Sequence, residues 1–555
     1  MCSITVGTEP EENHRKKAMQ SPPSHVQVIV VGLGPVGAAL ANLLGRHGIQ
    51  VLAIDQATDI FAAPRAIALD NEALRILQMC GVTEGEFETV AIPHVRMHSP
   101  VFGQFGQANS CGPMDGHPKL VTFFQPELEA VLRAKLATHP QVHIRLGVEM
   151  VSFTQDADGV HVSLKTAEGS TFMVHADYLI GADGANSLVR RQLGHKFDGQ
   201  TYPEDWLVVD AKKVPDPIDH VEFLCNHRRP VPHMVAPGGR QRWEFKLARH
   251  ETREEMEKPE TIQRLLAPWA KTEDIEIERV AVYRFHARVA DRFSSGRVFL
   301  VGDAAHITPP FIGQGLVAGL RDIGNLGWKL AWVLKRRAAP AILETYHQER
   351  RPHVVAMVRL ATFMGRMVMP GNAGSAFLVH GFMRCLRLVP RFRRLFEELE
   401  IKPAHCFQKG LFVGKGGPTR LRRGGLLAQG WVRAGLNASP LLSDDVLGET
   451  MVAIGFGVDP QQHLDAALSR SWLAAGGTFV QIDPRGRPCA GTQSERWEDL
   501  SGALVPSYAP VGWVAIARPD RTVMHEGPAT NVSSLISDSL RVLSPPSTAQ
   551  TARGF

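Results

Sequence analysis

Three glycines near the start of the chain are spaced as in a phosphate-binding turn. GLGPVG at 32–37 follows an apolar run and precedes a helical pattern, and Asp55 ends the next apolar run. Gly32 permits the bend, Gly34 lets the backbone approach a pyrophosphate, and Gly37 lets helix and strand pack closely. The helix N-terminus favours phosphate, and Asp55 can accept hydrogen bonds from both hydroxyls of an adenosine ribose. These four residues and Pro35 are the first cofactor-binding candidates.

Two later segments place small residues and an acid at a strand end, as a flavin requires. One is GADGANSLVR (181–190), and the other is GRVFLVGDAAHITPPFIGQGLVAGLRD (296–322). Asp303 is suited to accept from a ribityl hydroxyl. The helix after GQG would turn its N-terminal amides toward the electron-rich edge of an isoalloxazine and stabilise the reduced form. The candidates in the second segment are Gly302, Asp303, Pro310, Gly313, Gly315 and Leu316.

These motifs require alternating strands and helices, and the pattern from residue 25 onward supplies them. A buried strand at 25–31, the glycine turn, a helix at 38–48 and a strand at 50–55 form a βαβ unit of the dinucleotide-binding kind. The pattern also predicts helices at 69–79 and 125–138, an irregular glycine-rich stretch at 103–116, a β-meander at 141–180, a strand at 297–306 and a helix at 315–335.

Composition and pattern divide the chain into five segments of an α/β protein. Residues 1–24 have charges of both signs and no apolar stretch, which predicts a disordered extension. Residues 201–285 have strand-like runs without a glycine fingerprint, which predicts an inserted β-rich substrate domain. The other expected segments are an FAD-binding domain at 25–200 and 286–360, a helical, basic linker at 361–425, and a compact third domain at 426–555 with a strand–helix–strand–strand–helix order.

The chain resembles the single-component FAD-dependent aromatic hydroxylases over roughly residues 26–360. Besides the segments above, the resemblance rests on PRAIALDNEALRIL (64–77), FFQPELEAVL (123–132), NLGWKLA (325–331) and ETYHQERRP (344–352). With LLSDDVLG (441–448), these segments are most similar to the group that hydroxylates 3-(3-hydroxyphenyl)propionate or 3-hydroxycinnamate.

The resemblance implies a monooxygenase that uses FAD, NADH or NADPH, and dioxygen to convert a small phenolic acid into a catechol. It also implies a thioredoxin-like third domain, here without CxxC, that serves a structural role such as formation of a homodimer. Two alternatives stay open. One is a hydroxylase of another phenol, such as resorcinol, simple phenol or a polyketide-like aromatic; the other is a flavin-binding redox or interaction protein with vestigial catalysis.

The resemblance also assigns roles to four residues outside the glycine motifs. Arg65 and Gln125 are implied to touch the FAD or the passing nicotinamide. Asp183 is implied to organise the pyrophosphate side and the NADPH path, and Arg190 to support that loop. One departure is visible, because such enzymes commonly have Asn two residues after GQG, where this chain has Val317. Flavin contacts at that point must therefore come from backbone groups.

Three side chains are candidates for the group that polarises the phenol: Tyr202, Tyr283 and His306. Ordinary packing on a strand surface is the simpler explanation of each tyrosine, and packing or a hydrogen bond at a strand end is the simpler explanation of His306. Guanidinium groups bind carboxylates bidentately, so arginines of the substrate domain are candidates to hold the acid group. Those candidates, which could also be solvated surface charge, are Arg228, Arg229, Arg240 and Arg242.

Composition narrows the class of protein further. The 555 residues carry a net charge of +5 and seven cysteines without a CxxC pair, which predicts a reducing, cytoplasmic setting and neither a disulfide framework nor a metal site. Eleven Lys and Arg against three acids at 381–425 indicate a solvated basic linker rather than a nucleic-acid site. The uncharged stretch at 28–45 contains the glycine turn, which argues against a membrane span.

Overall fold

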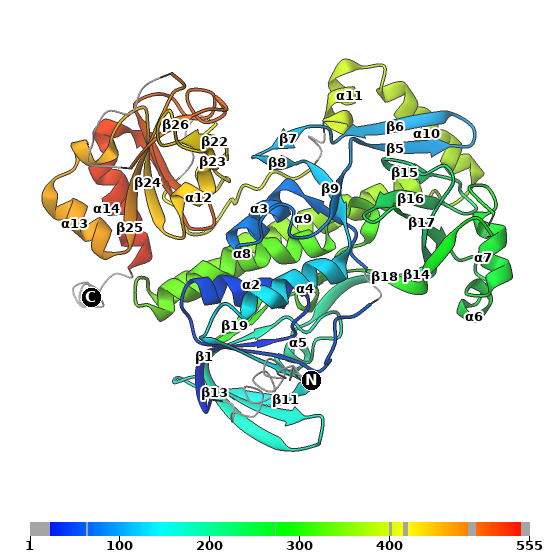
Figure 1. The fold of residues 1–555 in the computed structure, drawn as a ribbon, viewed down its shortest axis with the longest axis horizontal. Helices are drawn as coiled ribbons and strands as arrows, with labels where there is room; N and C mark the ends of the chain where they lie inside the picture. The colour runs from blue at the N-terminus through cyan, green and yellow to red at the C-terminus, as the bar shows by residue number, and fades with distance from the viewer. Residues whose placement is uncertain are drawn as a thin grey trace, which may run out of the picture.

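The computed structural model describes residues 23–62, 65–271, 273–398, 402–414, 420–486 and 495–544. The extension expected at 1–24 therefore lies almost entirely outside the described residues. Three large sheets organise the described chain, with helices packed against and between them, which confirms the predicted α/β class (Figure 1).

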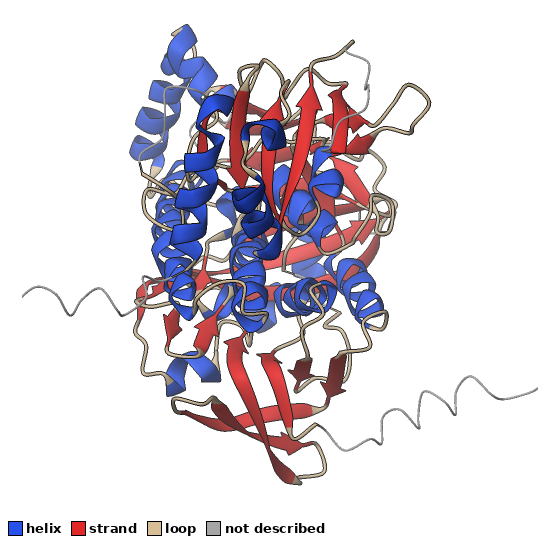
Figure 2. Cartoon of the chain, turned by 90° about the vertical axis from the view of Figure 1, so that its left-hand side faces the viewer, coloured by secondary structure: helices blue, strands red, loops and turns tan. Residues whose placement is uncertain are grey.

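The first sheet is the dinucleotide-binding sheet predicted from the glycine turn. Its strands are β1 (His25–Val31), β2 (Val51–Asp55), β10 (Val142–Leu146), β11 (Val148–Gln155), β12 (Val160–Thr166), β13 (Thr171–Gly181) and β20 (Val298–Leu300). Their order is β10-β2-β1-β13-β12-β11, with β20 beside β13. β10, β2, β1, β13 and β20 are parallel, and the apolar run of β1 suits a strand that is buried on both faces. The antiparallel end of this sheet lies at the bottom of the molecule in Figures 1 and 2.

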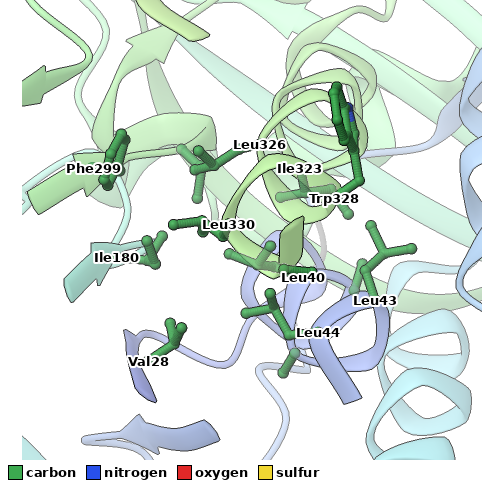
Figure 3. Close-up of a cluster of buried hydrophobic side chains, with 14 of the residues drawn as sticks. Val28, Leu40, Leu43, Leu44, Ile180, Phe299, Ile323, Leu326, Trp328 and Leu330 are labelled. Carbon is green, nitrogen blue, oxygen red and sulfur yellow. The ribbon is translucent and has the colours of Figure 1, made fainter. Parts of the chain in front are cut away.

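Three helices cover this sheet: α2 (Pro35–Arg46), α4 (Gln125–Leu136) and α8 (Gly315–Leu334). The helix expected at 38–48 instead begins inside the glycine motif, because the fixed φ of Pro35 suits the first helical position. Figure 3 shows how α8 crosses α2 above the strands. The buried side chains at this crossing are Val28, Leu40, Leu43, Leu44, Ile180, Phe299, Ile323, Leu326, Trp328 and Leu330.

The second sheet differs from two sequence-based predictions, the segment expected at 201–285 and the irregular stretch expected at 103–116. Its strands are β5 (His94–Ser99), β6 (Gly103–Asn109), β14 (Phe197–Lys212), β15 (Val221–Leu224), β16 (Val231–Ala236), β17 (Arg240–Lys246), β18 (Glu276–Ala290) and β21 (His306–Ile307), in the order β21-β18-β14-β17-β16-β15-β5-β6. Residues 94–109 therefore share one sheet with the segment 201–285, for which a substrate domain was expected, and we refer to this sheet as the substrate sheet. The stretch at 103–116 was wrongly predicted to be irregular. Gly106 of β6 lies opposite Met97 of β5, and the Met97 side chain packs closely against its backbone. Because glycine takes this place, β6 lacks the regular alternation of apolar and polar side chains that indicates a strand.

The two faces of this sheet have different surroundings. Leu207, Val209 and Trp243 belong to an apolar core with α6 (Arg253–Met256) and α7 (Pro259–Leu266). Alternation places Trp206, Val208 and Asp210 of β14 on the opposite face. Arg242 on that face donates to the carbonyl of Arg65, so this face meets the chain segment that follows β2 of the first sheet.

The third sheet forms the C-terminal domain. Its strands are β22 (Trp431–Arg433), β23 (Leu441–Leu442), β24 (Met451–Phe456), β25 (Gly477–Asp483), β26 (Glu495–Asp499), β27 (Trp513–Ala517) and β28 (Val523–Pro528), in the order β23-β22-β26-β25-β24-β27-β28. β25 and β24 are parallel, and β27 and β28 continue antiparallel, with α13 (Ala466–Ala474) and α14 (Val532–Leu543) packed against them. This is the arrangement expected of a thioredoxin-like domain.

Helices connect the second and third sheets. α9 (Glu344–Val368) runs past residue 360, where the FAD-binding segment was expected to end, and α10 (Ala373–Leu386) and α11 (Pro390–Glu397) follow it at the edge of the substrate sheet (Figure 1). The other elements are α3 (Asn71–Met79), α5 (Leu188–Gln192), α12 (Ser443–Leu447), and the short strands β3 (Ala68–Asp70), β4 (Thr89–Ala91), β7 (Pro113–Met114), β8 (His117–Pro118), β9 (Leu120–Phe123) and β19 (Ser294–Ser295). Among the described residues no single helix has the length and hydropathy of a membrane span; only Pro340–Val368 and Ala373–Leu386, bent at 112°, meet the criteria as a pair.

Candidate active site

The glycine turn has the geometry of a phosphate cradle. Gly32 adopts φ +98°, and a Cβ there would stand 2.4 Å from the carbonyl oxygen of Ala182. A Cβ on Gly37 would stand 1.9 Å from the carbonyl oxygen of Gly32, whereas a Cβ on Gly34 would meet nothing within 4 Å. α2 begins here with no side-chain cap and no acid in its first turn, so its amides are free to face an anion.

Asp55 lies beside this turn, as the end of β2 requires. Its Oδ2 accepts from the Leu33 amide at 2.7 Å, and its Oδ1 accepts from the Ala57 amide at 2.9 Å. Each carboxylate oxygen keeps a second lone pair for a ribose hydroxyl. Arg133 of α4, which the sequence analysis did not single out, donates to the Leu33 carbonyl at 3.2 Å. The i, i+4, i+8 spacing of Gln125, Glu129 and Arg133 was the signal that could have identified it.

The GADG segment forms a loop that Asp183 and Arg190 brace. Asp183 Oδ2 accepts from the amides of Leu188 and Val189 at 2.7 and 3.1 Å, while its buried Oδ1 has no hydrogen-bond partner among the described residues. Arg190 donates to the carbonyls of Ala185 and Ala304, at 2.8 Å in each case. These contacts fasten the loop to the segment that carries Asp303.

Asp303 lies in the short 3-10 helix η1 (Gly302–Ala304) directly after β20. Burial raises the pKa of its carboxyl above the ordinary value, and the charges of Arg65 and His306 only partly oppose that shift. No hydrogen bond to this carboxylate is present among the described residues. Asp303 is therefore an available acceptor at the strand end, as a ribityl chain requires.

The structure places His306 in a buried network rather than at an open site. Its imidazole and the Asp322 carboxylate are both fully buried, and Nε2 lies 2.6 Å from Oδ2. Asp322 also accepts from Arg350 Nε at 2.9 Å and from the amide of Gly302 at 3.1 Å. Burial alone would raise the pKa of Asp322, but His306 and Arg350 lower it. This buried pairing favours a structural role for His306 over its candidate role in polarising the phenol.

The GQG turn has open space beside Gly315, while Leu316 next to it packs against the apolar core. Gly313 has φ +63° at the end of the 3-10 helix η2 (Pro310–Ile312), and a Cβ on Gly315 would meet nothing within 4 Å. α8 starts there without a side-chain cap or an acid in its first turn. Leu316, the second residue of α8, is partly buried against the apolar core, so its backbone rather than its side chain is available to a flavin.

Gln125 contacts the backbone of Ala66, the residue after Arg65. The Gln125 side-chain oxygen accepts from the Ala66 amide at 3.1 Å, and its amide nitrogen donates to Glu129 at 2.7 Å. Arg65 itself is exposed, and its charge lies close enough to Asp303 to lower the pKa of that group. Gln125 thus holds the segment that carries Arg65.

The two tyrosine candidates have different surroundings. Tyr283 accepts from Arg279 at 3.0 Å. The hydroxyl of Tyr202 is buried and has no partner among the described residues. The Tyr202 ring lies edge-on to Phe311 of η2, with 6.1 Å between the ring centroids. Phe311 also contacts Trp206 and Phe285, so an aromatic cluster joins the substrate sheet to the GQG turn.

Three of the four candidate arginines already have carboxylate partners. Arg229 pairs with Glu251, Arg240 with Glu278, and the buried Arg242 binds Asp210 through two nitrogens at 2.6 and 3.0 Å. Asp210 also accepts from Arg279 at 3.1 Å, an ion cluster that the sequence analysis missed because its members lie on three strands.

Arg228 alone of the four is exposed with no ion-pair partner among the described residues. It borders a hollow of about 220 Å³ at the outer end of the substrate sheet. The other lining residues are Ser99, Pro100, Val101, Cys225, Asn226, His227, Ala373, Ala376 and Phe377.

Known proteins share both the sequence and the fold of this chain. The family model described as "FAD binding domain" matches residues 25–361, and "HcaD C-terminal domain" matches residues 424–542. A Burkholderia vietnamiensis protein named 3-(3-hydroxy-phenyl)propionate/3-hydroxycinnamic acid hydroxylase 2 is 36% identical over 95% of this chain and 98% of its own. An Escherichia coli O81 protein named 3-(3-hydroxy-phenyl)propionate/3-hydroxycinnamic acid hydroxylase is 35% identical over 83% of each chain.

Two solved structures show the same fold at low identity. The flavin-dependent monooxygenase PieE, in complex with FAD and substrate, has a TM-score of 0.78 and 21% identity over 94% of this chain and 100% of its own. Aklavinone-11 hydroxylase, with FAD and aklavinone, has a TM-score of 0.73 with the same identity and coverage. The open space at Gly34 and Gly315, and the Asp303 carboxylate, which accepts no hydrogen bond among the described residues, fit the FAD that both solved structures contain. The chain belongs to the FAD binding domain family and is a flavoprotein aromatic monooxygenase.

Proposed function

We propose that this enzyme uses NAD(P)H and dioxygen to add an ortho-hydroxyl to 3-(3-hydroxyphenyl)propionate or 3-hydroxycinnamate, giving the catechol. The names of relatives that are 35–36% identical over most of the chain support this substrate class. The structural observation that carries the proposal is the unpartnered Tyr202 hydroxyl beside the aromatic cluster at the GQG turn. A phenol ring would pack against Trp206, Phe285 and Phe311 and place its hydroxyl near that of Tyr202.

The cofactor would be held by the groups that the structure leaves open. The amides at the start of α2 would bind the pyrophosphate, Asp55 the adenosine ribose and Asp303 a ribityl hydroxyl. The amides after Gly313 and Gly315 would face the isoalloxazine and stabilise its reduced, anionic form. Arg65 and Gln125 would border the flavin ring. When bound, FAD would supply an electrophilic oxygen atom that comes from dioxygen, with NAD(P)H as the source of the two electrons.

The chain's own residues would make the phenol reactive and keep water out. A phenol attacks an electrophilic oxygen only when its hydroxyl is ionised or strongly hydrogen-bonded. Tyr202 can accept the phenol proton in a hydrogen bond, which increases electron density on the ring. The surrounding apolar rings exclude water, which would otherwise divert the reaction to peroxide release.

Arg229, Arg240 and Arg242 are already paired with carboxylates of the protein. Arg228 is therefore the remaining candidate to bind the substrate carboxylate. Its side chain is free among the described residues, and the hollow that it borders also offers the Phe377 ring and the polar groups of Asn226 and His227. The substrate acid would approach along this hollow. A soluble cytoplasmic enzyme with no nucleic-acid or membrane partner is the working proposal, and a homodimer is proposed for its assembly.

One experiment distinguishes this function from its alternatives. NADH and NADPH oxidation and product hydroxylation are measured together on 3-(3-hydroxyphenyl)propionate, 3-hydroxycinnamate, resorcinol, phenol and a fused polyketide phenol. We expect tightly coupled hydroxylation of the two acids. Coupled turnover of only a neutral phenol would replace the substrate, and an absence of hydroxylated product from every phenol would favour vestigial catalysis.

A further inference from the structure

The outer face of the substrate sheet gathers histidines that the proposed reaction does not use. β5 and β15 are parallel with Val95 opposite Val221, so His94 and His220, one residue earlier on each, are neighbours on one face. Their ring centroids are 5.1 Å apart. Val95 and Met97 of β5 point to the opposite face and pack in an apolar cluster with residues of α9 and α10. The histidine pair is therefore separated from that interior by the sheet itself.

The hydrogen bonding of these histidines is incomplete. His220 Nδ1 lies 2.9 Å from Asp219 Oδ1, which leaves Nε2 as its remaining ligand atom. Nε2 of His94 and Nε2 of His220 are both buried and have no hydrogen-bond partner among the described residues. Buried polar atoms in proteins are almost always bonded, so two neighbouring exceptions call for an unseen partner.

We propose that the Nε2 atoms of His94 and His220 bind a divalent transition-metal ion of the Zn²⁺ class, with Asp219 holding the His220 imidazole in place. One nitrogen or oxygen atom from each of these three residues lies within 4.8 Å of the other two, so small side-chain movements can bring the two imidazoles to one ion. Neutral imidazole is a suitable ligand for Zn²⁺, Ni²⁺ and Cu²⁺. An Asp carboxylate bonded to the Nδ1 of a ligating imidazole is also the usual means of orienting it.

The charged groups around His94 and His220 are compatible with a bound cation. Arg96 adds one positive charge near His94, while Asp219 and Glu222 add two negative charges near His220. The Asp219 side chain is 84% exposed, so the ion would keep water in its open positions. The bound metal would clamp the β5–β6 hairpin to β15, and we assign it a structural rather than a redox role.

The test uses the tag-free, full-length, FAD-loaded protein after dialysis against EDTA. Zn²⁺ is titrated against a chromophoric competitor, and the thermal unfolding midpoint is recorded with and without Zn²⁺. We expect a site that binds one Zn²⁺ per chain and raises the midpoint, because a ligand that binds only the folded state stabilises it. His94→Gln and His220→Gln should each abolish this site, and Asp219→Asn should weaken it about 10- to 100-fold. Cu²⁺ in the same site should give an electron paramagnetic resonance spectrum with coupling to two imidazole nitrogens.

A second histidine group provides the matched control. His25, His175 and His161 are cross-strand neighbours on the first sheet, and His161 pairs with Asp156 at 3.2 Å. His161→Gln should leave the Zn²⁺ site and the rise in midpoint intact. Zn²⁺ binding that survives both His94→Gln and His220→Gln, or that His161→Gln removes, would overturn the proposal, as would wild-type protein that binds no Zn²⁺. Phenol-dependent NAD(P)H oxidation is unaffected by these outcomes and tests the proposed function separately.

Discussion

Arg321 donates from Nη1 to the side-chain oxygen of Gln314 at 2.7 Å, which ties the start of α8 to its second turn. Gln314 in turn donates to Asp70 at 3.1 Å. Arg321 also pairs with Asp70 and Glu72, both at 2.6 Å, and Lys402 reaches the same carboxylates from the segment before the C-terminal domain. The turn that we assign to the flavin is thus held by a buried ion cluster that a distant segment completes.

Replacing Gln314 by Leu should loosen this turn and weaken FAD binding. The variant loses two side-chain hydrogen bonds, and one such bond contributes about 0.5–1.5 kcal/mol, or roughly 2- to 13-fold in affinity. FAD affinity is measured by flavin fluorescence during titration of the apoprotein. Lys402→Met is the control, since it leaves both bonds of Gln314 in place and should change FAD affinity less. Equal effects of the two variants would contradict a specific role for Gln314.

Asp303→Ala should also weaken FAD binding, for a different reason. It removes the acceptor assigned to a ribityl hydroxyl, which corresponds again to about 0.5–1.5 kcal/mol. Asp303→Asn keeps a side-chain acceptor and should recover part of the affinity. Unchanged FAD affinity in folded Asp303→Ala protein would refute the assignment.

Tyr202→Phe should lower the yield of hydroxylated product per NAD(P)H without destabilising the protein. The Tyr202 hydroxyl is buried and has no hydrogen-bond partner in the part of the chain that the structure describes. Such a group costs about 1–3 kcal/mol, so its removal should leave the free energy of unfolding unchanged or higher. Tyr283→Phe is the matched control, because that hydroxyl already serves Arg279. If Tyr283→Phe uncouples the reaction more than Tyr202→Phe does, the roles of the two tyrosines must be exchanged.

The interface between α8, α9 and the C-terminal domain should make stability sensitive to acid. Glu349 is fully buried and accepts from Arg518 at 2.7 Å and from Lys329 at 2.8 Å. Burial alone would raise the pKa of Glu349, but these two cations hold it well below its ordinary value of 4.5. Since the folded pKa lies below the unfolded one, this stabilisation is complete above about pH 4.5 and is lost as the pH falls toward the folded pKa.

Glu349→Gln tests that relationship. At pH 7 it should lower the free energy of unfolding by about 3–5 kcal/mol, because Lys329 then remains buried with no carboxylate bonded to it and Arg518 keeps only Asp520. It should also flatten the dependence of that free energy on pH below 4.5, measured by urea unfolding at pH 7, 5, 4 and 3. A pH dependence identical to that of the wild type would show that other carboxylates dominate the acid response.

The sequence predicted well what depends on local pattern. The GLGPVG turn, β1 and α8 follow from glycine spacing and apolar periodicity, and the structure places them within a few residues of the expected bounds. It could not predict contacts between distant segments. The pairing of Arg229 with Glu251, Arg240 with Glu278 and Arg242 with Asp210 distinguishes these three substrate-anchor candidates from Arg228, although all four look equivalent in the sequence. The membership of β5 and β6 in the substrate sheet was missed for the same reason, since the pairing of Val95 with Val221, 126 residues later, leaves no local signal.

Arg228→Met should reduce the preference for acidic over neutral substrates. If Arg228 receives the substrate carboxylate, the wild type should favour 3-(3-hydroxyphenyl)propionate over 3-ethylphenol by roughly ten- to more than a hundred-fold in kcat/KM, since a charge-assisted contact contributes about 1.5–3 kcal/mol. The variant should lose most of this preference, mainly through a higher KM for the acid, while FAD binding stays unchanged. Arg240→Met is the control, because Arg240 already pairs with Glu278 at 2.6 Å. A preference that persists in Arg228→Met but disappears in Arg240→Met would move the anchor to Arg240, and a wild type without any preference would remove the carboxylate from the substrate altogether.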